Sequence, residues 1–304
     1  MAKLRVSVVQ YLNTAPLVWG FTHGTLRGKY DLDFTVPARC GEALRTGEAD
    51  VGILPSIEFQ RMDGLAALPR MAIASKDHVR SLLVVAKKPI ERARRIALDC
   101  GSRTTQALVR ILCAGLWRVS PEFTEAAPDA ATMFREADAA LLIGDPALRI
   151  SLKIEGLARP TRAGELVCAP RDAGIPAGIG EALYVYDVAG EWRRMTGLPS
   201  VMAFWAARRE VATPELAADF LASRDYGLAR VDEISREASL SLDLPGPALA
   251  AYLRENIDFS MDDDNRRGLA EFFARCAALR LIPRAKPVEW APTQGSAASA
   301  RLAP

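Results

Sequence analysis

The sequence lacks most of the motifs and residue clusters that mark a metal, redox or nucleic-acid site. It has two histidines in 304 residues, His23 and His78, and its five cysteines stand singly without a CxxC pair, so we expect no metal site. GxSxG, P-loop and GxGxxG motifs are absent. The 39 basic and 37 acidic residues leave a net charge of +2, too small to attract nucleic acid or an anionic membrane over distance. A small-molecule ligand is the expected partner.

Long hydrophobic runs are also missing. No apolar stretch approaches the roughly 18 residues that a membrane span needs. The N-terminal segment MAKLRVSVVQYL carries Arg5 inside a short apolar run, which indicates a first strand rather than a signal peptide. Unpaired cysteines without an export signal favour a reducing compartment, so we expect a cytoplasmic protein. The sequence does not indicate an oligomeric state.

Short apolar segments that are present predict an α/β fold. In the N-terminal third, strands at 4–10, 30–36 and 50–54 alternate with helices at 14–22 and 38–47, the last ending at Gly47. This βαβαβ order predicts a parallel sheet covered by helices on both faces. Two further strand-like stretches, 65–74 and 80–86, lead out of this first unit.

A second α/β unit follows, and then a helical C-terminal region. The second unit has strands at 95–99, 139–143 and 182–188, a helix at 103–116, and a Gly-, Pro- and Arg-rich loop at 156–180. After a strand at 200–207, helices are expected at 213–230, 232–240, 246–256 and 262–280.

This order predicts two lobes, each a mainly parallel sheet flanked by helices. Lobe 1 is expected to contain residues 1–86 and 204–290, with lobe 2 inserted at 87–203 and a disordered tail at 291–304. Two crossing strands, near 84–90 and 199–207, join the lobes and leave a ligand cleft between them.

Small polar residues gather where predicted strands pass into helices. In parallel sheets these strand ends share one edge, and the unpaired N–H groups of helix N-termini there bind anions. The alternative for each position is an ordinary helix cap, or for Arg80 and Ser81 a solvated strand edge. The coincidence of several such positions favours a binding site for a small carboxylate. Its candidate residues are Tyr11, Asn13, Thr14, Ser56, Ser81, Ser102, Arg103, Thr104 and Asp145.

Seven segments in this order resemble the chorismate dehydratase family of the futalosine route to menaquinone, over about residues 4–283. They are VQYLNTAPL, ADVGILPSIEF, VRSLLVVAKKPIE, ALDCGSRTTQALVRIL, AALLIGDPAL, VYDVAGEWRRMTGLPSVMAFWAAR and ENIDFSMDDDNRRGLAEFF. The resemblance implies a type II periplasmic-binding-protein fold without an export signal. It implies a lyase that dehydrates chorismate to 3-[(1-carboxyvinyl)oxy]benzoate and needs no cofactor.

That reaction gives each candidate residue an expected role. We expect Asn13 to donate a hydrogen bond to reacting substrate, and Ser102, Arg103 and Thr104 to hold a substrate carboxylate. Ser56, with its neighbouring backbone, is expected to serve lobe 1 in the same way, and Ser81 to assist. Tyr11 and Thr14 are expected to bind substrate beside Asn13. Asp145 is either the base that removes the C3 proton or a helix cap, in which case the enolpyruvyl carboxylate of the substrate is the base.

Two other functions fit the same fold, because fold alone does not fix function. One is a binding protein that sequesters a small carboxylate without chemistry. The other is the sister pathway enzyme that releases 1,4-dihydroxy-6-naphthoate, for which we expect a histidine in the cleft. His23 and His78 stand in no such motif.

Overall fold

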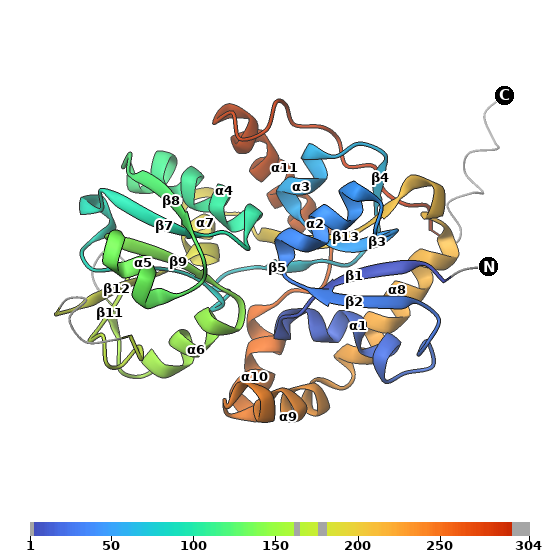
Figure 1. Cartoon of the computed structure of the whole chain (residues 1–304), viewed down its shortest axis with the longest axis horizontal. Coiled ribbons are helices and arrows are strands. Elements are labelled where there is room, and N and C mark those ends of the chain that lie inside the picture. The colour runs from blue at the N-terminus through green and yellow to red at the C-terminus, as the bar shows by residue number, and fades with distance from the viewer. Residues whose placement is uncertain (1–2, 161–164, 176–180, 294–304) are drawn as a thin grey trace. The chain divides into compact units, whose positions relative to one another are not determined.

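The computed structural model describes residues 3–160, 165–175 and 181–293. The chain divides into two compact units (Figure 1). Unit 1 comprises Met1–Ala74 and Val201–Pro304, and unit 2 comprises Ser75–Ser200. Unit 1 is therefore discontinuous in sequence and contains the C-terminal helices. Most of the tail expected at 291–304 lies outside the described residues.

The sheet of unit 1 is mixed, with the order β2-β1-β3-β13-β4 and β5 pairing with β13. The pairs β1–β2 and β1–β3 are parallel, while β13 is antiparallel to β3 and β4. β1 and β3 are buried almost throughout and contain Val, Ile and Leu, as expected for strands covered on both faces. Its strands are β1 (Arg5–Val9), β2 (Asp31–Thr35), β3 (Val51–Pro55), β4 (Leu65–Ala67), β5 (Ile73–Ser75) and β13 (Ser200–Arg208).

The helices of unit 1 include a closely packed pair, α1 and α8, and a helix, α2, that ends at a glycine. α1 and α8 lie side by side (Figure 1), and the hydroxyl of Ser223 on α8 donates to the Leu17 carbonyl oxygen of α1 at 2.9 Å. α2 ends as predicted at Gly47, whose φ of +82° lies in the left-handed region that glycine adopts without a steric cost. The helical elements are η1 (Leu12–Thr14), α1 (Ala15–Thr22), α2 (Pro37–Thr46), α3 (Ser56–Arg61), η4 (Arg209–Val211), α8 (Pro214–Leu228), α9 (Val231–Leu242), α10 (Gly246–Ala251), η5 (Tyr252–Asn256) and α11 (Asp263–Ala278).

Unit 2 also contains a mixed sheet, with the order β10-β11-β12-β6-β9-β7-β8. Among the described residues, the pairs β9–β7 and β7–β8 are parallel, and the other four strand pairs of this sheet are antiparallel. The strands are β6 (Leu82–Ala86), β7 (Arg95–Asp99), β8 (Glu122–Ala126), β9 (Ala139–Ile143), β10 (Arg159–Pro160), β11 (Leu166–Cys168) and β12 (Leu183–Asp187).

Alternate residues of the unit 2 strands face different helices. Leu83 and Val85 of β6 join a buried cluster with Met133 and Phe134 of α5 and Ile150 of α6. α4 and α7 contact each other, and α7 also packs on β6 and β12. The helical elements are η2 (Ile90–Arg92), α4 (Arg103–Leu112), η3 (Cys113–Trp117), α5 (Ala130–Glu136), α6 (Gly144–Ile154) and α7 (Val188–Thr196).

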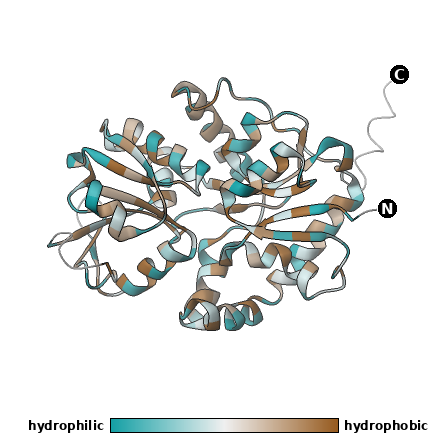
Figure 2. Ribbon diagram, viewed as in Figure 1, coloured by the Kyte–Doolittle hydropathy of each residue, from teal (hydrophilic) through white to brown (hydrophobic). Residues whose placement is uncertain are grey.

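Hydropathy follows this layering in each unit. Figure 2 shows brown, hydrophobic residues along the central strands and teal residues on many of the helices. Among the described residues, no helix has both the length and the apolar character needed to cross a membrane.

Three details of the predicted elements need correction. The strand predicted at 65–74 is two short strands, β4 and β5, separated by a turn in which Arg70 has a φ of +67°. The loop predicted at 156–180 contains β10 and β11, although 161–164 and 176–180 lie outside the described residues. The sheets are mixed rather than mainly parallel. Connections as short as that between β10 and β11 cannot make a parallel crossover, so such strands pair antiparallel.

Candidate functional site

In unit 1, two of the predicted corners lie at one edge of the sheet. β1 and β3 are parallel neighbours, with Val6 opposite Val51 and Ser7 opposite Gly52. Their carboxyl ends therefore reach the same edge, where β1 leads into the segment 11–14 and β3 leads directly into Ser56.

The segment after β1 leaves an amide group available for a ligand. The Thr14 N–H donates to the Tyr11 carbonyl oxygen at 2.9 Å, which closes the short helix η1. Thr14 is buried, and its hydroxyl donates to Oδ1 of Asn13 at 3.4 Å. Asn13 is half-buried, and within the described residues its Nδ2 donates no hydrogen bond. Asn13 thus has its oxygen supported and its N–H groups unused.

Ser56 is less available than the sequence suggests. Its side chain is fully buried, and its hydroxyl donates to the Val201 carbonyl oxygen at 2.7 Å. Nearby in α3, the buried Glu58 forms ion pairs with Arg45 at 2.6 Å and Arg61 at 2.8 Å. Glu58 is therefore a structural residue, and the hydroxyl of Ser56 is not free to bind a ligand.

In unit 2, three predicted positions meet at one sheet edge. β7 and β9 are parallel, so the corners that follow them, 100–102 and 144–145, lie on the same side. β6 runs antiparallel to β9, with Leu82 opposite Ile143, which brings the start of β6 to that edge. The Gly144 N–H donates to the Ser81 carbonyl oxygen at 2.8 Å. Ser81 is thereby adjacent to the first turn of α6.

The N-terminus of α4 is not closed by its own cap residue. Ser102 occupies the N-cap position, but its hydroxyl donates to Oγ1 of Thr105 at 2.7 Å and makes no capping hydrogen bond. Ser102, Thr104 and Thr105 are all buried. Arg103 points instead to β8, where it pairs with Glu125 at 3.3 Å. Ser102 therefore does not cap the first turn of α4, and the positive end of this helix dipole suits an anion.

Asp145 is not the N-cap of its helix, and that interpretation is wrong. α6 begins at Gly144, its N-cap residue is Ile143, and Asp145 lies half-buried inside the first turn. In that place its carboxylate interacts favourably with the positive end of the helix dipole.

Two aspartates at the same sheet edge were missed. Asp99 ends β7, and its Oδ1 accepts the Gly101 N–H at 2.8 Å. The side chain is 1% exposed, Oδ2 has no hydrogen-bond partner among the described residues, and burial raises the pKa of this carboxyl. Asp187 ends β12 and caps α7. An Asp at the end of an apolar strand, in ALDCG and YVYDV, was the available signal.

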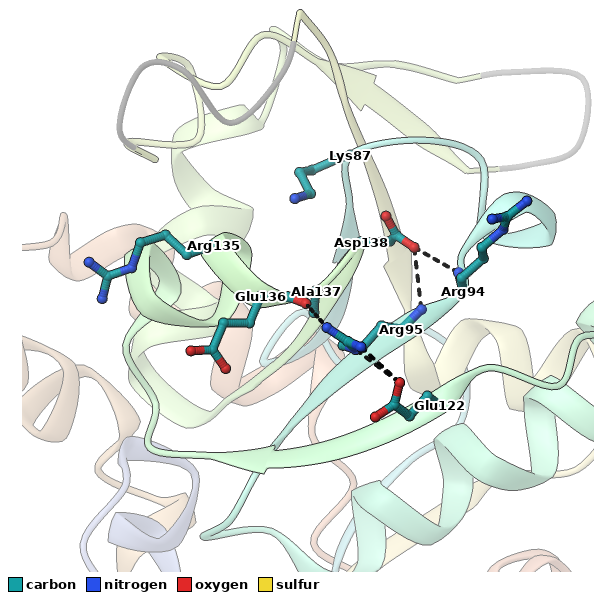
Figure 3. Close-up of a pocket in the computed structure, with 8 residues that line it drawn as sticks. All are labelled: Lys87, Arg94, Arg95, Glu122, Arg135, Glu136, Ala137 and Asp138. Atoms are coloured by element: carbon teal, nitrogen blue, oxygen red, sulfur yellow. Dashed lines mark hydrogen bonds and ion pairs between the residues drawn. The ribbon is translucent and has the colours of Figure 1, made fainter.

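A separate cavity of about 290 Å³ lies at the opposite edge of the unit 2 sheet (Figure 3). Arg95 bridges it, donating to Glu122 at 2.9 Å and to the Glu136 carbonyl oxygen at 3.1 Å. Asp138 accepts from the backbone N–H groups of Arg94 and Arg95. Because it contains none of the predicted residues, we do not assign a ligand to it. No group of three or more His, Cys, Asp or Glu side chains in the described ranges is placed to hold a metal ion.

Comparison with known proteins identifies the family of this chain. The model of a family described as menaquinone biosynthesis matches residues 4–278. The chain belongs to this family. A curated relative, the chorismate dehydratase of Thermus thermophilus, is 28% identical over 289 residues, which cover 91% of this chain and 96% of the relative.

Solved structures agree on the fold. A protein of Archaeoglobus fulgidus superposes with a TM-score of 0.69 at 18% identity, covering 92% of this chain and 98% of that one. The periplasmic aliphatic sulphonate-binding protein of Escherichia coli has a TM-score of 0.62 at 17% identity, covering 96% and 92%. The expected periplasmic-binding-protein-like fold is confirmed.

Proposed function

We propose that this protein is a lyase that dehydrates chorismate to 3-[(1-carboxyvinyl)oxy]benzoate in menaquinone biosynthesis. The observation that carries the proposal is the match to a chorismate dehydratase along 91% of the chain, within a family of menaquinone biosynthesis. The geometry of each unit is consistent with a small dicarboxylate, since both present uncapped helix starts at the carboxyl edge of a sheet.

The chemistry is an elimination that the substrate itself favours. The C3–H bond of chorismate is vinylogous to the ring carboxylate, so the electron pair left by the proton can spread onto that group. The C4–O bond then breaks, C3 and C4 become doubly bonded, and the ring becomes aromatic. Proton and hydroxide leave together as water, so the reaction balances without an oxidant or reductant, and we propose that it proceeds without a cofactor.

Asn13 and the N-terminus of α4 are the proposed contacts with the substrate. The unused Nδ2 of Asn13 is a donor for charge that develops as the C3 proton leaves. The N–H groups of the first turn of α4, with Ser102 and Thr104, hold a carboxylate. Arg103, held by Glu125, contributes positive charge at longer range.

The remaining predicted residues shape these two contacts. Tyr11 and Thr14 position Asn13, and Ser56 supplies backbone at the neighbouring strand end. Ser81 and Asp145 form the third part of the unit 2 edge.

For the base, we propose the enolpyruvyl carboxylate of chorismate. An intramolecular base benefits from a high effective molarity, so a weak base held close to C3 suffices. Asp145 then acts through its charge at the start of α6 rather than by taking the proton.

Product analysis tests this function against the two alternatives. Purified protein is incubated separately with chorismate and with the cyclic precursor of 1,4-dihydroxy-6-naphthoate. We expect an aromatic product from chorismate alone. Binding of chorismate without turnover would identify a sequestering protein, and turnover of the cyclic precursor would identify the sister enzyme. The five free thiols fit the reducing cytoplasm in which we propose the reaction takes place.

A further inference from the structure

Asp187 joins two segments that are far apart in the sequence. Its Oδ1 accepts the N–H groups of Ala189 and Gly190 at 3.0 Å each, which caps α7. The same carboxylate also accepts the Val79 N–H at 3.1 Å and, through Oδ2, the Arg80 N–H at 2.6 Å. A cap needs only the first pair, so the second pair requires a separate explanation.

The second pair holds a turn that is strained. Arg80 has a φ of +63°, in the left-handed region that residues with a side chain rarely adopt. Its side chain is fixed as well, because Nε donates to Ser151 at 3.2 Å and Nη2 to Glu155 at 2.8 Å. The Asp187 carboxylate therefore holds the backbone of this left-handed turn. Ser151 of α6 and Glu155, the residue after α6, hold the Arg80 side chain.

The residue after this turn belongs to the candidate site. Ser81 follows Arg80 directly and accepts the Gly144 N–H at 2.8 Å. Asp145 is the next residue of α6. The conformation of Arg80 thus determines where Ser81 lies relative to the first turn of α6.

We propose that Asp187 is a positioning residue of the substrate site, which holds the Val79–Arg80 turn and so fixes Ser81 against the start of α6. The inference rests on the proposed function for its catalytic consequence. His78, which precedes the Val79–Arg80 turn, packs against Gly190 in the first turn of α7. A β-carbon on Gly190 would overlap the His78 ring, so this contact also holds the turn against α7.

The substitution Asp187→Ser separates positioning from capping. Serine is a good N-cap and can still accept from the start of α7. It has one side-chain oxygen where aspartate has two, and that oxygen is closer to the backbone, so it does not reach Val79 and Arg80. We expect kcat/KM for chorismate to fall about 30-fold, since small misplacements of site groups reduce rates strongly. Amide hydrogens of residues 79–82 should exchange at least about tenfold faster.

The substitution Arg80→Gly provides the rescue. Glycine adopts positive φ without a steric cost and needs no carboxylate to hold it there. In an R80G background, Asp187→Ser should therefore reduce kcat/KM only about threefold, a coupling that a capping role alone does not produce. Asp129→Ser is the matched control, because Asp129 caps α5 through Thr132 alone. It should leave kcat/KM and exchange at 79–82 unchanged.

Amide exchange tests the structural role of Asp187, and turnover of chorismate tests the proposed function, so the two hypotheses can be rejected independently. A wild-type protein inactive on chorismate contradicts the proposed function, while faster exchange at 79–82 in D187S still supports the structural role of Asp187. If the wild type is active, any one of three results overturns the positioning role. These are unchanged amide exchange at 79–82 in D187S, unchanged turnover in D187S, or a loss of kcat/KM in the R80G background as large as that in the wild-type background.

Discussion

At the scale of single residues, Asn13 is the donor on which the proposed chemistry depends most. Asn13→Ala removes Nδ2 and should cost about 2–4 kcal/mol of transition-state stabilisation, or roughly 30- to 1,000-fold in kcat/KM. The matched control is Asn256→Ala, a half-buried asparagine at the end of η5. Steady-state kinetics on both variants, with circular dichroism as a check of folding, test whether Asn13 has this role. Normal turnover by folded N13A contradicts the role.

Asp145 and the substrate carboxylate compete for the role of base. With the substrate as base, Asp145→Asn should retain appreciable turnover, because the amide keeps the shape of the first turn of α6. A chorismate analogue without the enolpyruvyl carboxylate should bind and fail to react. If D145N instead binds chorismate and shows no turnover, Asp145 is the base.

Asp99 gives a prediction on stability rather than on catalysis. Burial raises the pKa of its carboxyl, so the folded state binds the proton more tightly than the unfolded state. The free energy of unfolding therefore falls as the pH rises from the ordinary pKa of aspartate through the raised value. Urea unfolding at pH 4 and pH 7 should show that Asp99→Asn loses less stability than the wild type over this interval.

Asp129 serves as the control with the opposite sign. Hydrogen bonds from Thr132 lower the pKa of its carboxyl, so its contribution to stability is present above the ordinary pKa and is lost as the pH falls. As the pH rises, the free energy of unfolding of Asp129→Asn should therefore decrease relative to that of the wild type, whereas that of Asp99→Asn should increase relative to it. Equal pH dependence of D99N and the wild type would contradict the account of Asp99.

At the scale of elements, the approach of α1 and α8 tests how firmly the Asn13 corner is held. Gly227 of α8 faces the Pro16 carbonyl in the first turn of α1, and a β-carbon would overlap it. Gly227→Ala should reduce the free energy of unfolding by about 1–3 kcal/mol through overpacking. It should also lower kcat, because α1 begins at Ala15, two residues after Asn13. Gly246→Ala is the control, since its nearest neighbour would be an ordinary 3.6 Å away. If denaturant unfolding shows the same free energy of unfolding for both variants, the close approach of α1 and α8 does not limit stability and the prediction is wrong.

Elements with strong local patterns were predictable from the sequence. β3 and β9 are short, continuous apolar runs, β1 is rich in valine, and α11 has an amphipathic face. β8 and α5 were missed, because β8 is an edge strand with only partial burial and α5 is seven residues long. β10 and β11 depend on pairing with β12, a tertiary contact that a local pattern does not contain.

The sequence predicted which strand ends share an edge, but not the hydrogen bonds that the candidate residues make there. Parallel neighbours bring Asn13 and Ser56 to one edge, as the βαβ order implied. The sequence could not reveal that Ser56 donates to Val201 or that Arg103 turns to Glu125, because those partners lie on other strands. The link from Asp187 to Arg80 spans 107 positions and was equally invisible.

At the scale of the whole molecule, the fold is periplasmic-binding-protein-like and the proposed activity is that of an enzyme. The two are compatible, because the proposed elimination needs an anchored dicarboxylate, a hydrogen-bond donor and a base that the substrate carries. The most direct test is a proton NMR time course of chorismate with purified protein and no added metal or cofactor. We expect one 3-[(1-carboxyvinyl)oxy]benzoate to form for each chorismate consumed, at a rate that Asn13→Ala reduces at least about 30-fold. Chorismate that binds and remains unchanged would contradict it.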